Sequence, residues 1–135
     1  MTTVCKEITF DAAHMLSGYE GKCRNLHGHT YRLVVEASGE PDDSGMVEDF
    51  FNLKRHLEEK VAAALDHAYL YDARSAEECE LAHFLQARGK RVVGLPFRTT
   101  SENLARHIYG LLSEELNVSA VRLWETPTSC AVFTA

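Results

Sequence analysis

The sequence predicts an α+β fold in which helices lie on one face of an antiparallel sheet. Two segments with alternating apolar residues open the chain, two segments with helical spacing of apolar residues follow, and two segments rich in β-formers close it. With 135 residues, 45% of them hydrophobic, the chain has enough apolar material for one core. No repeat or long linker divides it, so we expect a single domain over residues 1–135.

The first two strands are expected over residues 4–14 and 27–38. Apolar side chains at alternate positions share one face of a strand. These positions are Val4, Ile8, Phe10 and Ala12 in the first segment, and Tyr31, Leu33, Val35 and Ala37 in the second. Residues 17–22 are expected to form a loop, and the turn residues at 39–45 predict a turn before a short strand at 46–47.

A helix is expected to begin after Asp49 and to end at Asp66 and His67. Aspartate is a common helix N-cap, and apolar residues follow it at helical spacing. They are Leu53, Leu57, Val61, Ala64 and Leu65. Taken alone, Asp66 and His67 are explained as a helix end, where a histidine near the last carbonyls is favourable.

Two more helices are expected in the second half of the chain. Ser75 and Glu78 have the spacing of a capping box and predict a short helix, after which residues 90–95 are a candidate strand. Thr100 or Ser101 is expected to cap the next helix. Its buried stripe consists of Leu104, Ile108, Leu111 and Leu112.

The chain is expected to close with two strands, over residues 120–126 and 130–134. In the first of them Val121, Leu123 and Glu125 point to the same face. A carboxylate on an apolar face is costly unless it is paired. Glu125 therefore needs either the guanidine-like edge of a ligand, which gives a carboxylate two parallel hydrogen bonds, or an intramolecular cation such as Arg122 or Lys54.

Composition excludes several classes of partner. The formal net charge is −6, from 14 Lys and Arg against 20 Asp and Glu, whereas a general nucleic-acid or membrane-surface binder needs a basic face. We therefore expect a small-molecule partner. The four cysteines form no CxxC pair and the N-terminus has no apolar signal segment, so we expect a cytoplasmic protein with reduced thiols.

The strongest chemical signal is the stretch around His27 and His29. On an extended strand these two side chains project from the same face, and Gly28 between them adds no bulk. His14 has the parity to complete a three-histidine site for zinc, with one position left open as in catalytic zinc sites. Cys23 is either a fourth ligand or a reactive thiol; its loop-like surroundings favour a thiol near the metal, where the cation lowers the pKa of the thiol.

Five motifs resemble one family in order and approximate spacing. They are FDAAH, CxxxHGH, LDHAYL, TSENLA and WETPT, and they resemble the 6-pyruvoyltetrahydropterin synthase and 6-carboxytetrahydropterin synthase family. The cysteine-to-histidine spacing is most similar to the bacterial 6-carboxytetrahydropterin synthase branch. The resemblance implies the tunnelling fold, in which subunits join their sheets into a barrel, and a homo-oligomer, trimer or hexamer, with active sites near subunit interfaces.

The resemblance also implies an activity. It is that of a zinc-dependent carbon–carbon lyase that converts 7,8-dihydroneopterin triphosphate to 6-carboxy-5,6,7,8-tetrahydropterin, acetaldehyde and triphosphate, in 7-deazaguanine (queuosine) biosynthesis. Zinc is expected to act as a Lewis acid on the side-chain oxygens of the substrate. The alternatives are a 6-pyruvoyltetrahydropterin synthase, which eliminates the triphosphate, and a zinc-binding module without catalysis.

Residue roles follow from the same resemblance. Metal binding falls to His14, His27 and His29, catalysis to Cys23 as general base with Asp66 and His67 completing a triad, and pterin binding to Glu125, Thr100 and Ser101. Lys22, Arg24 and Arg98 are candidates for holding the triphosphate. His56, His83 and His107 match no motif and are expected to be exposed on helices. Residues 72–98 are expected to be an insertion that shorter members lack, with an effect on subunit contacts or substrate entry.

Overall fold

The computed structural model describes residues 1–135 and contains one six-stranded sheet with the strand order β4-β3-β1-β2-β5-β6. The elements in chain order are β1 (Thr2–His14), the 3-10 helix η1 (Lys22–Arg24), β2 (His27–Gly39), α1 (Phe50–His56), the π-helical segment η2 (Leu57–Ala62), α2 (Ala63–Leu65), β3 (Ala68–Asp72), α3 (Ala76–Gln86), β4 (Val92–Leu95), α4 (Ser101–Ser113), β5 (Val118–Thr126) and β6 (Ser129–Phe133). The α+β class is confirmed. None of the helices has both the length and the apolar character needed to cross a bilayer.

The two long strands β1 and β2 form the centre of the sheet. They pair antiparallel over their whole length without a register shift, from Thr2 opposite Gly39 to His14 opposite His27. β5 and β6 extend the sheet antiparallel on one side. The strands predicted from alternation are therefore confirmed.

The expectation of a wholly antiparallel sheet is wrong at one edge. β3 pairs parallel with β1, and β4 pairs parallel with β3. β3 follows the α1–α2 helix and β4 follows α3. A helix between two strands lets the second strand run in the same direction as its neighbour, which gives parallel pairing. Side-chain alternation is the same in both directions of pairing, so the sequence pattern does not encode this difference.

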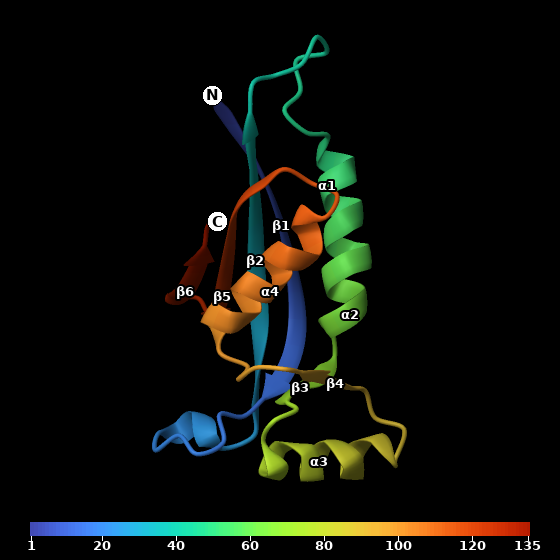
Figure 1. The fold of residues 1–135 in the computed structure, drawn as a ribbon, viewed down its shortest axis with the longest axis vertical. Helices are drawn as coiled ribbons and strands as arrows, with labels where there is room; N and C mark the ends of the chain where they lie inside the picture. Colours follow the sequence, from blue (N-terminus) through green and yellow to red (C-terminus); the bar gives the residue numbers. More distant parts are fainter.

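The core lies between one face of the sheet and the helices. Figure 1 shows the α1–α2 rod and α4 on the same face of the sheet, while α3 lies across the end near β3 and β4. The largest fully buried side chains come from both layers and include Tyr31, Leu33, Leu53, Leu57, Leu65, Leu104, Ile108, Leu112 and Leu123. The helices thus cover the face from which the in-phase side chains of β1 and β2 project, as predicted.

The predicted helix over 50–65 is continuous, but its middle third is π-helical. Asp49 caps it, because its carboxylate accepts a hydrogen bond from the backbone N–H of Phe51 at 2.8 Å. His56 is buried at 3% exposure, with Nδ1 2.8 Å from the Asn52 carbonyl oxygen and Nε2 2.9 Å from Glu115. The expected exposure of His56 is wrong because Glu115, in the segment after α4 and 59 positions away, packs against this helix face.

Other local predictions have mixed outcomes. His83 is exposed as predicted, whereas His107 is half-buried with its ring 5.5 Å from that of Phe97. No strand forms at Met46; instead the Asp42 carboxylate accepts backbone hydrogen bonds from Ser44 and Met46 and closes a tight turn. A side chain that binds its own loop backbone competes with strand pairing.

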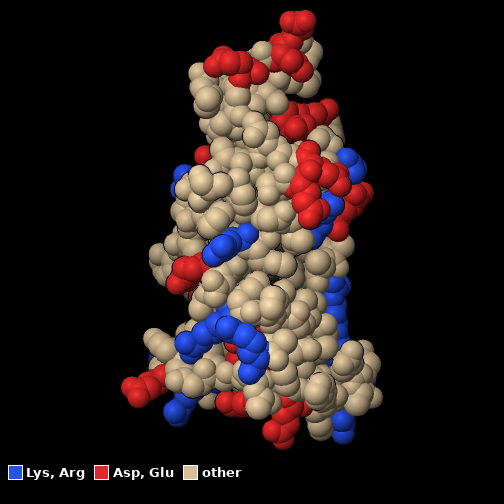
Figure 2. All heavy atoms as spheres, in the orientation of Figure 1, with Lys and Arg blue, Asp and Glu red and all other residues tan.

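The charged groups are unevenly distributed. Figure 2 shows acidic side chains gathered at the end that carries the loop before α1, whereas Lys and Arg are more frequent toward the opposite end, where α3 and the loop between β1 and β2 lie. On the face shown in Figure 2, basic groups are thus more frequent near the end of the sheet that carries the predicted site.

We expect Leu53→Ala to lower the free energy of unfolding by about 2–5 kcal/mol, because it leaves a cavity at a fully buried position. Glu59→Ala on the exposed side of the same helix is the control and is expected to change stability by less than about 0.5 kcal/mol. Urea unfolding followed by circular dichroism measures both. Equal effects of the two substitutions would contradict the placement of this helix.

Candidate functional site

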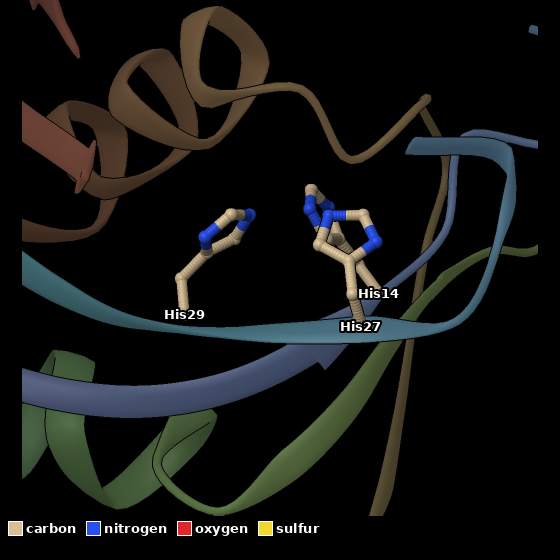
Figure 3. A group of neighbouring side chains, drawn as sticks. All are labelled: His14, His27 and His29. Atoms are coloured by element: carbon tan, nitrogen blue, oxygen red, sulfur yellow. The ribbon is translucent and has the colours of Figure 1, made fainter. Parts of the chain in front are cut away.

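Three histidines converge where β1 ends and β2 begins. His14 pairs directly with His27, and His29 lies opposite Ala12, so all three project from the helix-covered face. Figure 3 shows the rings of His14, His27 and His29 grouped on one side of the two strands. Their ring centroids are 4.7–5.2 Å apart, and one nitrogen from each ring lies within 4.8 Å of the others.

Backbone carbonyls fix the tautomers of two of these rings. His14 Nδ1 lies 2.8 Å from the carbonyl oxygen of Thr99, and His27 Nδ1 lies 2.7 Å from that of Asn25. A carbonyl only accepts, so each Nδ1 carries the proton and donates, which leaves a lone pair on Nε2. The Nε2 atoms of all three histidines are buried without a hydrogen-bond partner.

The protonation state suits metal binding. Burial lowers the pKa of His14 to about 4; the hydrogen bond to Thr99 opposes this shift, and the neighbouring His27 and His29 reinforce it. Burial and then His27 also lower the pKa of His29. Neutral imidazoles are the form that binds metal ions, and three of them with free Nε2 atoms match a zinc site with an open position. The residues present therefore fit a metal ion at this cluster.

Thr99 is a residue that the sequence analysis missed. It is fully buried, its carbonyl oxygen accepts from His14, and its hydroxyl lies 3.2 Å from the same ring nitrogen. Ligand-orienting groups of this kind commonly accompany metal-binding histidines. The only sequence signal is its position directly before the cap of α4, which does not distinguish it from other loop threonines.

Cys23 lies on η1, in the loop that joins the two histidine-bearing strands, and is half-buried. Its carbonyl oxygen accepts a hydrogen bond from the N–H of Leu16 at 2.8 Å. Its thiol is not part of the group of atoms that lie within 4.8 Å of one another in the histidine cluster. Of the two alternatives for Cys23, this geometry favours a separate thiol over a fourth ligand.

Asp66 and His67 lie on the opposite side of the sheet. The Asp66 carboxylate accepts a hydrogen bond from the backbone N–H of Asp11 at 2.9 Å and lies 3.0 Å from Nδ1 of His67. The backbone N–H of His67 donates to the carbonyl of Asp11. The hydrogen bond from Asp11 is the main cause of the lowered pKa of Asp66. Because Asp11 and His14 have opposite strand parity, this pair faces the open side of the sheet, away from the histidine cluster of its own chain.

Glu125 lies at the end of β5 and faces the histidine cluster, with Oε1 3.9 Å from Nε2 of His14. Neither of the cations considered above pairs with it, since Arg122 bonds to Glu36 and Lys54 lies near Glu58. Burial raises the pKa of Glu125, as does repulsion from Glu102, while His27 opposes the shift. A half-buried carboxylate without a cation suits a ligand that donates hydrogen bonds.

Tyr31 adds a second polar group without a partner. Its ring is fully buried, its hydroxyl has no hydrogen bond, and its ring centroid lies 5.4 Å from that of His29. Burial, with the nearby charge of Glu125, raises the pKa of this phenol. The hydroxyl therefore stays protonated and adds a donor beside the cluster.

Thr100 and Ser101 have local partners. The Thr100 hydroxyl caps α4 by accepting from the N–H of Asn103 at 3.3 Å, and the Ser101 hydroxyl donates to Glu102 at 2.9 Å. Both residues are half-buried. Thr100 is thus the cap, and the structure places both residues directly after Thr99 rather than among the groups without partners.

Comparison with known proteins gives consistent matches over the whole chain. Residues 3–135 match the family described as 6-pyruvoyl tetrahydropterin synthase. The 6-carboxy-5,6,7,8-tetrahydropterin synthase of Haemophilus influenzae is 47% identical, with 96% of each chain covered, and that of a Synechocystis strain is 36% identical, covering 97% of this chain and 92% of the relative. The 6-pyruvoyl tetrahydropterin synthase of Plasmodium falciparum has the same fold, with a TM-score of 0.78, 22% identity and coverage of 99% and 97%.

We expect the metal-free protein to lose stability as the pH falls from about 6.5 to about 4. The unfolded chain binds a proton on His14 near pH 6.5, whereas the folded chain binds it only near pH 4, so acidification in this window favours unfolding. His29 acts in the same direction. Two glutamates also titrate near the lower end of this window: Glu115, with a pKa lowered from 4.5, acts in the same direction, whereas Glu125, with a raised pKa, acts in the opposite direction.

Melting temperatures of chelator-treated protein at about pH 7 and about pH 5 measure the effect. His14→Asn, which removes one titrating ring, is expected to show a smaller loss than the parent protein. His83→Asn at an exposed position is the control and is expected to keep the full loss. An equal loss in all three proteins would show that the buried histidines do not govern acid stability.

Proposed function

Since the chain belongs to the 6-pyruvoyl tetrahydropterin synthase family, we propose that it is a zinc-dependent lyase that converts 7,8-dihydroneopterin triphosphate and water to 6-carboxy-5,6,7,8-tetrahydropterin, acetaldehyde and triphosphate. The observation that carries this proposal is the cluster of three histidines with buried, partnerless Nε2 atoms. The names of the two relatives support the carboxy product over the pyruvoyl product. The corresponding place in metabolism is 7-deazaguanine (queuosine) biosynthesis, in the cytoplasm.

The metal is proposed to be zinc, held by His14, His27 and His29. The donor set supports this choice, because three imidazole nitrogens suit a borderline-soft ion and leave a position open for a substrate. When bound, zinc supplies a Lewis acid that stabilises negative charge on side-chain oxygens of the substrate. The chain's own contribution is to hold the rings neutral and oriented, through burial and through the carbonyls of Thr99 and Asn25.

Cys23 is proposed as the general base. It removes the proton from the side-chain carbon of the substrate next to a hydroxyl, and a thiolate suits this task when its pKa is close to the working pH. The support is the position of Cys23 in the loop between the two strands that bear the histidines. Cys23 is thus near His27 in the sequence, but its thiol is not a member of the histidine cluster. Metal binding and proton transfer then belong to different residues and are separable by substitution.

Glu125 is proposed to hold the pterin ring. The guanidine-like edge of the pterin offers two parallel N–H donors, which match a carboxylate that has no cation in this chain. Thr100 and Ser101 are proposed to line the same pocket, with the hydroxyl of Thr100 also serving as the α4 cap.

Basic side chains near the loop between β1 and β2 are proposed to receive the triphosphate. Arg24 lines a cavity of about 440 Å³ whose other charged residues are Glu20 and Glu77, and Arg98 reaches the same loop through a bond to the Ser17 carbonyl. Lys22 lies on η1 beside Arg24. The greater frequency of basic groups toward this end in Figure 2 agrees with an anionic ligand there.

We propose that Asp66 and His67 serve the site of a second copy of the chain. They face the open side of the sheet, whereas the histidine cluster of their own chain projects from the covered side. The side chain of His67 is 76% exposed, so it is available to a partner. The aspartate orients the imidazole and supports its protonated form while it relays a proton. This arrangement implies a homo-oligomer, trimer or hexamer, with sites near the interfaces.

We expect Cys23→Ala to keep bound zinc and to lose at least about 100-fold in turnover, because general acid–base catalysis contributes 10²–10⁴-fold. His27→Ala is expected to lose both zinc and turnover. Cys5→Ala on the exposed sheet face is the matched control and keeps both. Bound zinc is measured by atomic emission, and products are identified by mass spectrometry under anaerobic conditions.

The outcomes separate three functions. A product that retains the pyruvoyl side chain identifies the alternative enzyme, 6-pyruvoyltetrahydropterin synthase. Zinc binding without turnover of the pterin triphosphate in the parent protein identifies a metal-binding module. Full turnover by Cys23→Ala would remove the thiol from the mechanism.

We also expect activity to return when inactive subunits are mixed. His67→Ala and Cys23→Ala proteins are each expected to be inactive, whereas co-expression gives assemblies in which one subunit supplies the thiol and another the imidazole. About a quarter of the parent activity is expected, since a shared site needs one intact copy of each kind. Differently tagged subunits allow mixed assemblies to be purified and assayed. No recovery in verified mixed assemblies would contradict a site shared between subunits.

A further inference from the structure

The segment 72–98, expected from the sequence to be an insertion, contacts the loop that carries Cys23. Met15, at the start of this loop, packs in a small apolar cluster with Tyr69 and with Ala82 of α3. Arg98 donates to the carbonyl of Ser17 at 3.2 Å from the other end of the segment. Figure 1 places the loop and α3 at the same end of the sheet.

Glu78 is the centre of this contact. It occupies the third position of α3 and is only 1% exposed. One carboxylate oxygen accepts from the N–H of Asp72 at 3.0 Å, and the other accepts from the hydroxyl of Ser17, which also lies 2.9 Å from the Ser75 hydroxyl. Burial of a carboxylate is costly without such donors, so the inward orientation of Glu78 is specified by the loop that it binds.

The capping box predicted from Ser75 and Glu78 forms only in half. Ser75 caps α3 by accepting from the N–H of Glu78 at 3.2 Å, but the N–H of Ser75 donates to the Asp72 carbonyl instead of the glutamate. In a complete capping box the glutamate would bond the N–H of Ser75. The Glu78 carboxylate therefore does not bond the N–H of its own helix cap and binds the loop at Ser17 instead.

A short path of hydrogen bonds leads from Glu78 to Cys23. Ser17, fixed by Glu78, is bonded covalently to Leu16, and the N–H of Leu16 donates to the carbonyl of Cys23 at 2.8 Å. The turn is closed further by the N–H of Tyr19, which donates to the Leu16 carbonyl at 3.1 Å. A shift of Ser17 therefore displaces the backbone that carries the thiol.

We propose that Glu78 is a positioning residue that fixes the Cys23 thiol through Ser17, and that this is what segment 72–98 contributes to the site. The catalytic consequence rests on the proposed function of Cys23 as general base, whereas the structural consequence does not. Small displacements of a reacting group lower the rate of the chemical step more than they weaken substrate binding.

Ser17→Ala is the most direct test, because it removes the hydroxyl that Glu78 binds and leaves the bond between Glu78 and Asp72. We expect kcat to fall by about 10- to 100-fold with a much smaller change in KM, and zinc content to stay that of the parent. Alkylation of Cys23 by iodoacetamide, followed by peptide mass spectrometry, is expected to become several-fold faster because the loop is released.

Two variants of α3 complete the experiment. Glu78→Gln keeps an acceptor for the N–H of Asp72 and a polar contact to Ser17. This single variant of the parent protein is therefore expected to retain a kcat and a rate of Cys23 alkylation near those of the parent. Glu80→Gln, at an exposed position of the same helix, is the control and is expected to change neither. Circular dichroism establishes that each variant is folded.

The proposal is overturned if folded Ser17→Ala protein shows parent kcat and parent alkylation of Cys23. It is also overturned if Glu78→Gln loses activity, zinc and melting temperature together, because that pattern reports a general structural role. The alkylation comparison requires no turnover. If the parent protein fails to act on the pterin triphosphate, the proposed function falls while the positioning of Cys23 is still decided.

Discussion

The register between β1 and β2 is the constraint on which the site depends. With His14 opposite His27 and Ala12 opposite His29, the three imidazoles share one face and one end of the sheet. A slip of one residue would send His27 and His29 to the other face, because strand side chains alternate with a period of two. The apolar residues that continue the same parity along both strands hold this register, since a slip would also expose the core.

The same register determines the electrostatics of the site. The helices that bury the core also remove His14 and Tyr31 from water, and burial shifts both groups toward their neutral forms. A buried polar atom without a partner lowers the stability of the folded state by about 1–3 kcal/mol. Four such atoms lie together here, so their combined destabilisation is large for a fold of this size. A metal ion at the proposed site, together with a ligand, would relieve that cost, and this agrees with atoms that have no partners inside the chain.

Features that depend on residues close together in the chain are predictable from the sequence, whereas features that depend on distant residues are not. The strands, the caps at Asp49 and Thr100, and the convergence of the histidines depend on alternation and on neighbouring residues, and the sequence predicts them. The parallel pairing of β3 and β4, the burial of His56 and the support of His14 by Thr99 arise between residues far apart in the chain. Local patterns carry no information about such partners.

Glu78 and the pair formed by Asp66 and His67 show the same limit at the level of function. Each lies near a helix end and has a local explanation, yet Glu78 binds a loop 61 residues away, and the backbone of His67 is tied to Asp11 on the open side of the sheet. This chain of 135 residues uses one sheet face for its core and its proposed metal ligands, so a group on the other face would complete such a site only in a second copy. The small size of the subunit is therefore a physical argument for the shared active site that we propose, and this argument does not depend on the family to which the chain belongs.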